Sequence, residues 1–489
     1  MLLPKSKQSL LRGFDDKDSI YEEFDSSTNP DRALLLEENN EKIFDPNWKE
    51  YRERPVHWLL KCFVQSFNMV VLCSLLVSAV SVIIMFVNIN TTEVCFDVQW
   101  DNLPEKLKRV RVTVEVVIGW CLQYYHIVVM IFVFGFKLVD ELHLLHLNVV
   151  AAFTDMAYRL FLQLYDNYGW ESKLYILNAI FVGVMLVNSY TLAKHYYNER
   201  TRKIILTMQL GVQFILTAAV AYSTFYLFNP WFVKLEMFKR TVVAAVIPIV
   251  GVILKVLCRL TIHDIQINHP GTSYMLLAEG YIATSLVYRT IQAQIQKTPV
   301  FIILCLIQSV AGFVGQLCIL FYRPLLRWLY KKVLKGNRYS ISDPTITPRS
   351  QRLMADVFIC NTISEINALI YTNAFVQLYA MKVGYENDGN KNQEDNKLKE
   401  FFLRTFTVIL IECVFITFRI FIMTWFKNIP VMRVWRKKWK TFLGVSLCIS
   451  ASTVMYITHY LTYIVAGQVG EQLSRNKTLP CDLSKSLFL

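Results

Sequence analysis

Glycine and proline are scarce in this sequence, with 17 and 14 residues among 489. Their average shares in proteins are roughly 7% and 5%, so both fall well below expectation. Membrane helices that pack through small residues, and transporters built on broken helices, depend on these residue types. The scarcity therefore argues against both designs, and the 32 phenylalanines and 25 tyrosines predict packing by large aromatic side chains.

Motifs for catalysis and metal binding are also missing. The sequence contains no GxSxG, P-loop or HExxH motif, and no spacing of cysteine and histidine typical of a zinc site. His459 stands alone in an apolar segment, so a membrane-embedded lipid enzyme built on it is only a third alternative. We expect no metal and no other cofactor, and we favour a protein that is not an enzyme.

Apolar residues are abundant, at 54% of the chain, against about 45–50% in soluble proteins. A helix needs about 20 apolar residues to cross a bilayer. Segments of that length lie at 63–88, 112–136, 174–193, 204–228, 240–260, 299–322, 401–426 and 440–466. A ninth, 354–382, carries several polar residues and fits only if these face other helices or water.

Two weaker segments, 143–165 and 272–292, either span the bilayer or lie amphipathically at its surface. The sequence thus predicts an all-α protein, a polytopic integral membrane helical bundle of nine to eleven transmembrane helices. The lipid bilayer is its first expected partner.

Charge gives the orientation. Lysine and arginine outnumber the acidic residues 51 to 38, and two loops, 323–352 and 427–440, carry net charges of +7 and +6. Positive loops stay in the cytosol, so we expect a cytosolic N-terminus, an extracellular or lumenal C-terminus and no nucleic acid partner. Four bases between 106 and 111 fall on the outer side and oppose this topology. Both basic loops are also expected to attract anionic lipid headgroups.

The first 60 residues carry 13 acids and nine bases, with few aliphatic side chains, a composition typical of disorder. We expect a disordered cytosolic tail at 1–60, a transmembrane domain at 61–466 and a short outer tail at 467–489. Two patterns in the first tail resemble sorting signals for trafficking adaptors. Tyr21 and Phe24 form a tyrosine-based pattern, and Asp31 with Leu35 and Leu36 forms an acidic dileucine pattern. Such signals favour the plasma membrane or an endolysosomal membrane.

The outer segments hold two glycosylation sequons and two cysteines. Asn90 and Asn476 each begin an Asn-x-Thr sequon, and Asn476 is favoured because Asn90 lies close to the membrane. Cys95 and Cys481 face an oxidising compartment in this topology, so a disulfide between them is a hypothesis.

Ionisable side chains within spans are costly and are therefore candidates for function. The sharpest group lies in the last third of the chain, where Asn361 and Glu365 share one helix face and Glu412 and Arg419 share another. A Glu365–Arg419 or Glu412–Arg419 pair would leave another carboxylate free to bind a proton or cation. Glu115 is a further candidate, and Asp155 and Arg159 are spaced to form an ion pair within one helix.

These observations favour transport or channel-type passage of a small solute, ion or lipid through the bundle, with the buried carboxylates lining or gating the path. The alternative is a non-catalytic membrane receptor or scaffold, in which the buried charges fix helix packing and the tail carries trafficking signals.

Overall fold

The computed structural model describes most of the chain between residues 55 and 473. The described ranges are 55–91, 103–165, 171–263, 270–295, 297–314, 348–388, 391–425 and 429–473. They all belong to one compact unit, Tyr51–Leu489, and they are almost entirely helical, as the all-α prediction requires. Most of the acidic tail and the end of the outer tail lie outside these ranges, so the predicted domain boundaries stay predictions.

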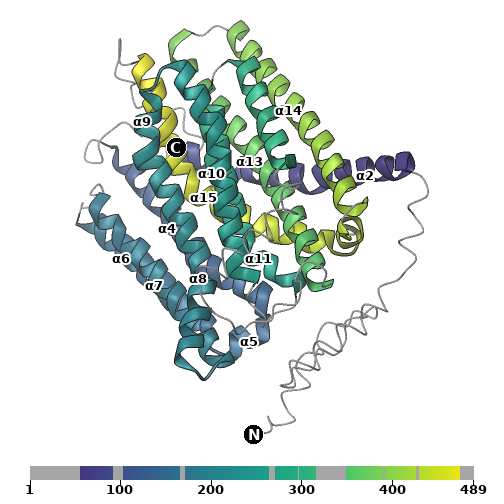
Figure 1. Ribbon diagram of the computed structural model, residues 1–489. Coiled ribbons are helices and arrows are strands. Elements are labelled where there is room, and N and C mark those ends of the chain that lie inside the picture. The colour runs from purple at the N-terminus through teal and green to yellow at the C-terminus, as the bar shows by residue number, and fades with distance from the viewer. Residues whose placement is uncertain are drawn as a thin grey trace. The chain divides into compact units, whose positions relative to one another are not determined.

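The described part of the chain forms a series of helices. They are α2 (Pro55–Met69), the π-helical segment η3 (Val70–Leu75), α3 (Leu76–Thr91), α4 (Glu105–Phe134), α5 (Phe136–Glu141), α6 (Leu144–Leu164), α7 (Glu171–Tyr196), α8 (Arg200–Tyr222), η5 (Ser223–Phe228), α9 (Asn229–Val233), α10 (Met237–His263), α11 (Pro270–Ala293), α13 (Pro348–Asp388), α14 (Lys391–Trp425) and α15 (Val431–Leu473). A further helix, Thr298–Val314, lies between α11 and α13. Figure 1 shows their arrangement.

Seven of the described helices are long and apolar enough to cross a membrane. The qualifying stretches are Glu105–Phe134, Ile176–Tyr196, Arg200–Val220, Met237–Lys255, Gln351–Val376, Phe401–Trp425 and Val431–Thr458. Two shorter apolar helices, Leu76–Thr91 and Thr298–Val314, accompany them. The chain is therefore a multi-pass membrane protein with at least this set of candidate spans. The prediction of nine to eleven spans, and the side on which each terminus lies, remain predictions.

The two weaker segments are both helical, as α6 and α11, but neither is among the seven. α11 packs against α8, α10, α13 and α15, and nearly all its described side chains from Tyr274 onward are buried. A helix surrounded by protein does not need an apolar outer face, which explains its modest hydropathy. Of its two predicted placements, the one flat on the membrane surface does not fit this burial.

α13 shows why the polar ninth segment is a helix of the core. In an apolar 18-residue window within Gln351–Val376, 83% of the residues are buried, whereas the figure for the corresponding window within Met237–Lys255 of α10 is 17%. Asn361, Asn367 and Asn373 would be costly against lipid, so they place α13 inside. Valine and isoleucine cover α10, which can face hydrocarbon. The largest helix contact in the described structure joins α11 to α13.

Polar side chains link the helices where small residues are few. Asn148 of α6 and Asn188 of α7 exchange amide hydrogen bonds of 3.2 and 3.3 Å. Asn367 of α13 donates to Ser450 of α15 over 2.9 Å. Such bonds between transmembrane helices each contribute about 0.6–2 kcal/mol, so they help hold α6 against α7 and α13 against α15.

Candidate functional site

Five charged side chains meet in the core between α10, α11, α13 and α14, and we call them the charged network. It consists of Lys255 of α10, Arg289 of α11, Glu365 of α13, and Glu412 and Arg419 of α14. Their side chains are between 0 and 15% exposed. Charges at such depth are stable only if they are paired and hydrogen-bonded.

Glu365 is shared by two cations. Its Oε1 lies 3.2 Å from Nζ of Lys255, and its Oε2 lies 3.5 Å from Nη1 of Arg419. Lys255 also donates to Oδ1 of Asn361 over 2.7 Å and to Oγ of Ser285 over 3.3 Å. One carboxylate thus bridges α10 and α14, which no single pair would do.

Glu412 pairs with Arg289 in the same core. Nη2 of Arg289 lies 2.6 Å from Oε1 of Glu412, and the two side chains are 0% and 2% exposed. Nη1 of Arg289 donates to Oε1 of Gln292 over 3.3 Å and approaches Sγ of Cys305 at 3.2 Å. This pair links α11 to α14 and is the most deeply buried ion pair among the described residues.

Two aromatic rings lie next to Lys255, and a glycine lies next to Arg419. Nζ of Lys255 lies 5.2 Å from the centre of the Tyr281 ring and 5.5 Å from that of Tyr288, distances at which ring faces stabilise a cation. Nη2 of Arg419 donates to the carbonyl of Ser309 over 3.1 Å. Gly312, one turn further on the helix Thr298–Val314, has no room for a methyl group, because the guanidinium of Arg419 occupies that space.

The structure brings together most of the side chains singled out from the sequence. Asn361 and Glu365 both accept hydrogen bonds from Lys255. Arg419 contacts Glu365, so the predicted Glu365–Arg419 pair is present. Glu412 lies in the same core, with Arg289 as its partner. In the described structure both carboxylates are therefore paired, so the free carboxylate expected from the sequence is not seen in this arrangement.

Glu115 does not join the network. It lies on α4 beside α6, where Nη1 of Arg159 is 3.3 Å from its Oε2. Nε of the same arginine lies 2.9 Å from Oδ2 of Asp155, which confirms the predicted Asp155–Arg159 ion pair. Gly119, one turn along α4, lies directly against Asp155 and Arg159. This second charged group therefore depends on a glycine that lets α4 and α6 approach closely.

Replacing Gly119 with alanine should destabilise the protein. The new methyl group would overlap Oδ2 of Asp155, and overpacking of this kind costs about 1–3 kcal/mol. Thermal unfolding of the purified protein measures the effect. Gly183→Ala, at a helical glycine of α7 with open space around it, is the matched control and should be neutral or slightly stabilising. Equal midpoints for the two variants would contradict the close contact.

Sequence reasoning missed Arg289 and undervalued Lys255. Arg289 lies near the end of the marginal segment 272–292, where an arginine is unremarkable. Lys255 lies near the end of an apolar run, where a lysine usually extends its ammonium group to the membrane surface. Its distance from acidic partners in the sequence, 110 residues from Glu365, hides the interaction.

The remaining predicted sites fall largely outside the described residues. These are the sorting patterns at Tyr21, Phe24, Asp31, Leu35 and Leu36, the sequon at Asn476, and Cys95 with Cys481. Asn90 is described at the end of α3, where its Nδ2 donates to the carbonyl of Phe86 over 2.8 Å. None of these predictions is tested by the contacts.

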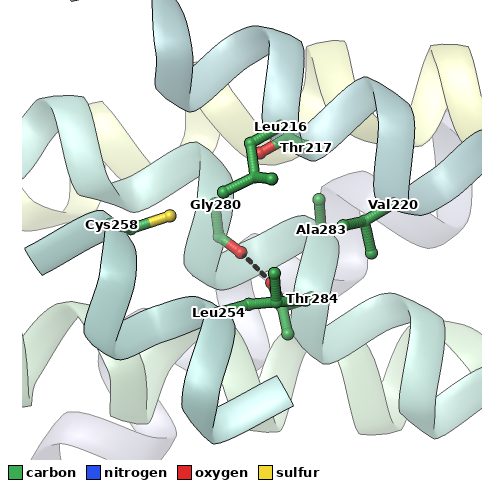
Figure 2. Close-up of a pocket in the computed structure, with 8 residues that line it drawn as sticks. All are labelled: Leu216, Thr217, Val220, Leu254, Cys258, Gly280, Ala283 and Thr284. Atoms are coloured by element: carbon green, nitrogen blue, oxygen red, sulfur yellow. Dashed lines mark hydrogen bonds between the residues drawn. The ribbon is translucent and has the colours of Figure 1, made fainter. Parts of the chain in front are cut away.

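A small cavity lies between α8, α10 and α11 (Figure 2). Leu216, Thr217 and Val220 come from α8, Leu254 and Cys258 from α10, and Gly280, Ala283 and Thr284 from α11. The Thr284 hydroxyl donates to the carbonyl of Gly280. The cavity holds about 10 Å³, which is roughly the space for one water molecule, so the described helices pack closely beside the charged network.

No protein family model, no curated protein and no solved structure matches the chain. Among those that the structure describes, no group of three or more histidine, cysteine, aspartate or glutamate side chains is placed to hold a metal ion. The long apolar helices and the buried ion pairs identify the chain as a multi-pass helical membrane protein with a charged core.

Proposed function

We propose that this protein forms a gated pathway through the membrane for a small solute, ion or lipid, and that the charged network is the gate. The observation that carries the proposal is the sharing of Glu365 by Lys255 and Arg419. These two cations belong to α10 and α14, and the carboxylate to α13. Three separate helices therefore depend on one acidic side chain.

A shared carboxylate allows two alternative pairings in the core. Glu365 can pair with Lys255 alone or with Arg419 alone, and either choice releases one of the two cations from the carboxylate. Lys255 retains Asn361 and Ser285 as partners in the second case, and Arg419 retains the Ser309 carbonyl in the first. Conformational switches in proteins commonly work through such exchanges of ion pairs.

The described arrangement fits the closed state of such a gate. Both carboxylates are paired, and the cavity beside the network admits only about one water molecule. Passage then requires that the Glu365 carboxylate exchange one of its two cations for the other. Buried ionisable side chains in transmembrane helices commonly mark such pathways.

A single methyl group tests the gate without changing any charge. Gly312→Ala would displace the Arg419 guanidinium and weaken its pairing with Glu365. We expect flux to rise by about 2- to 30-fold, the effect of roughly 0.5–2 kcal/mol on the closed state. Proteoliposomes report it through dyes for chloride, sodium, potassium and protons and through transfer of a fluorescent phospholipid between leaflets.

Gly444→Ala is the matched control, because this helical glycine of α15 has open space around it. It should leave flux unchanged. If the wild-type protein moves none of these species, or if Gly312→Ala and Gly444→Ala behave alike, the gate is overturned.

A second candidate function is a non-catalytic membrane receptor or scaffold. One observation favours this receptor or scaffold. Glu365 and Glu412 are already paired with cations, as carboxylates are when their role is to hold helices together. Its tail would carry the trafficking information, with adaptors as partners. Such a protein should tolerate Glu365→Gln and Glu412→Gln in any flux assay and should respond instead to an extracellular ligand.

In either case we propose residence at the plasma membrane or in endolysosomal membranes. The sorting patterns of the N-terminal tail support this placement, and glycosylation at Asn476 would accompany it. The basic segments 323–352 and 427–440 would contact anionic headgroups on the cytosolic face. They are not only loops as expected from the sequence, because α13 begins at Pro348 and α15 at Val431.

A further inference from the structure

The charged network is unbalanced. Lys255, Arg289 and Arg419 supply three positive charges, and Glu365 and Glu412 supply two negative ones, which leaves one positive charge in excess among the described side chains. Asp356, on the same helix as Glu365, is already paired with Arg352 over 3.0 Å. An uncompensated charge at this depth is costly and calls for a counterion.

Unused hydrogen-bond donors lie in the same network. Nε of Arg289 and Nε of Arg419 are buried and have no hydrogen-bond partner among the described residues. Nε2 of Gln292, whose oxygen accepts from Arg289, is in the same condition. All three are N–H groups on fully or almost fully buried side chains, so a ligand that satisfies them must be an acceptor of hydrogen bonds.

The packing limits what that ligand can be. The small cavity between α8, α10 and α11 holds only about 10 Å³, and the rings of Tyr281 and Tyr288 lie against the ammonium group of Lys255. A carboxylate metabolite or a phosphate group would require more space, and a divalent anion would exceed the single charge. The chemistry that fits is a small monovalent inorganic anion.

We propose that the charged network binds one chloride-like anion, which accepts hydrogen bonds from its unused N–H groups and competes with the Glu365 carboxylate for the positive charge of Lys255 and Arg419. Binding of the anion is inferred from the charged network alone. Its movement across the membrane rests on the proposed function.

Binding is measured on the full-length protein in nanodiscs, starting from a gluconate buffer and adding sodium chloride, bromide or phosphate. Radioactive chloride gives the stoichiometry, and thermal unfolding gives a second readout. We expect saturable binding of about one chloride per chain, competition by bromide and little effect of phosphate. No saturable chloride binding, or binding of phosphate in its place, would overturn the proposal.

Two variants locate the site. Lys255→Met removes the excess charge and should weaken chloride binding about tenfold or more, whereas Lys137→Met, at an exposed lysine of α5, should bind as wild type. Glu365→Gln removes the competitor and should tighten binding by a similar factor, which keeps the inference testable if Lys255→Met does not fold. Unchanged affinity in Glu365→Gln contradicts it.

The two proposals fail separately. Chloride binding without flux of any tested species supports the anion site and overturns the pathway. Flux without chloride binding supports the pathway and overturns the anion site.

Discussion

Replacing Glu412 with glutamine is expected to lower the free energy of unfolding by about 3–5 kcal/mol, the largest stability effect that we predict for a single charge. The change leaves the guanidinium of Arg289, which is 0% exposed, without its carboxylate. Burial makes the remaining charge costly because no water reaches it. Chemical denaturation in detergent, followed by tryptophan fluorescence, measures the loss.

The double variant Arg289→Met with Glu412→Leu separates this cost from the value of the pair. Apolar side chains of similar volume often replace a buried ion pair with little loss of stability, so the double variant should recover most of what Glu412→Gln loses. Glu105→Gln breaks an exposed pair with Arg109 and serves as the control, with an effect near zero. A Glu412→Gln protein as stable as this control would show that the buried pair does not hold α11 and α14 together.

The architecture could be predicted from the sequence because membranes impose simple rules. Every segment expected to span overlaps a helix in the described structure, since a single apolar segment of about 20 residues satisfies its own backbone in hydrocarbon by forming a helix. The polar residues of segment 354–382 also predicted that it would face other helices, and α13 is indeed a core helix.

Part of the candidate site could be predicted for a similar reason. Asn361 and Glu365 lie one turn apart, and Arg419 lies on the next span, so local spacing and helix order were enough to suggest that they meet. The pairing of Glu412 with Arg289 could not be predicted from local spacing or helix order. The two residues are 123 positions apart, and a single sequence does not reveal which distant helices become neighbours.

Lys255 shows a different limit. Its position near the end of an apolar run predicts an ammonium group at the membrane surface, whereas the structure turns it inward to Glu365 and Asn361. The surrounding tyrosines of α11 and the carboxylate of α13 make the inward orientation favourable, and neither is visible from the sequence around Lys255. Glu115 differs in the opposite sense. The sequence suggests it as a member of the candidate site, whereas the structure pairs it with Arg159 away from the charged network.

Replacing Glu365 with glutamine should abolish flux while the protein still folds. Glutamine keeps an oxygen that can accept a hydrogen bond from Lys255, and Arg419 still donates to Ser309, so both cations retain polar partners. What disappears is the negative charge that alternates between them. Without it, the exchange that the gate requires cannot take place.

The most direct measurement of this account compares flux of wild type, Glu365→Gln and Glu115→Gln in proteoliposomes that hold equal amounts of folded protein. Glu115 is also a half-buried carboxylate paired with an arginine, but it lies outside the charged network, so its neutral variant controls for the loss of any such charge. We predict background flux for Glu365→Gln and flux close to wild type for Glu115→Gln. Unchanged flux in a folded Glu365→Gln protein would contradict the assignment of the charged network as a gate.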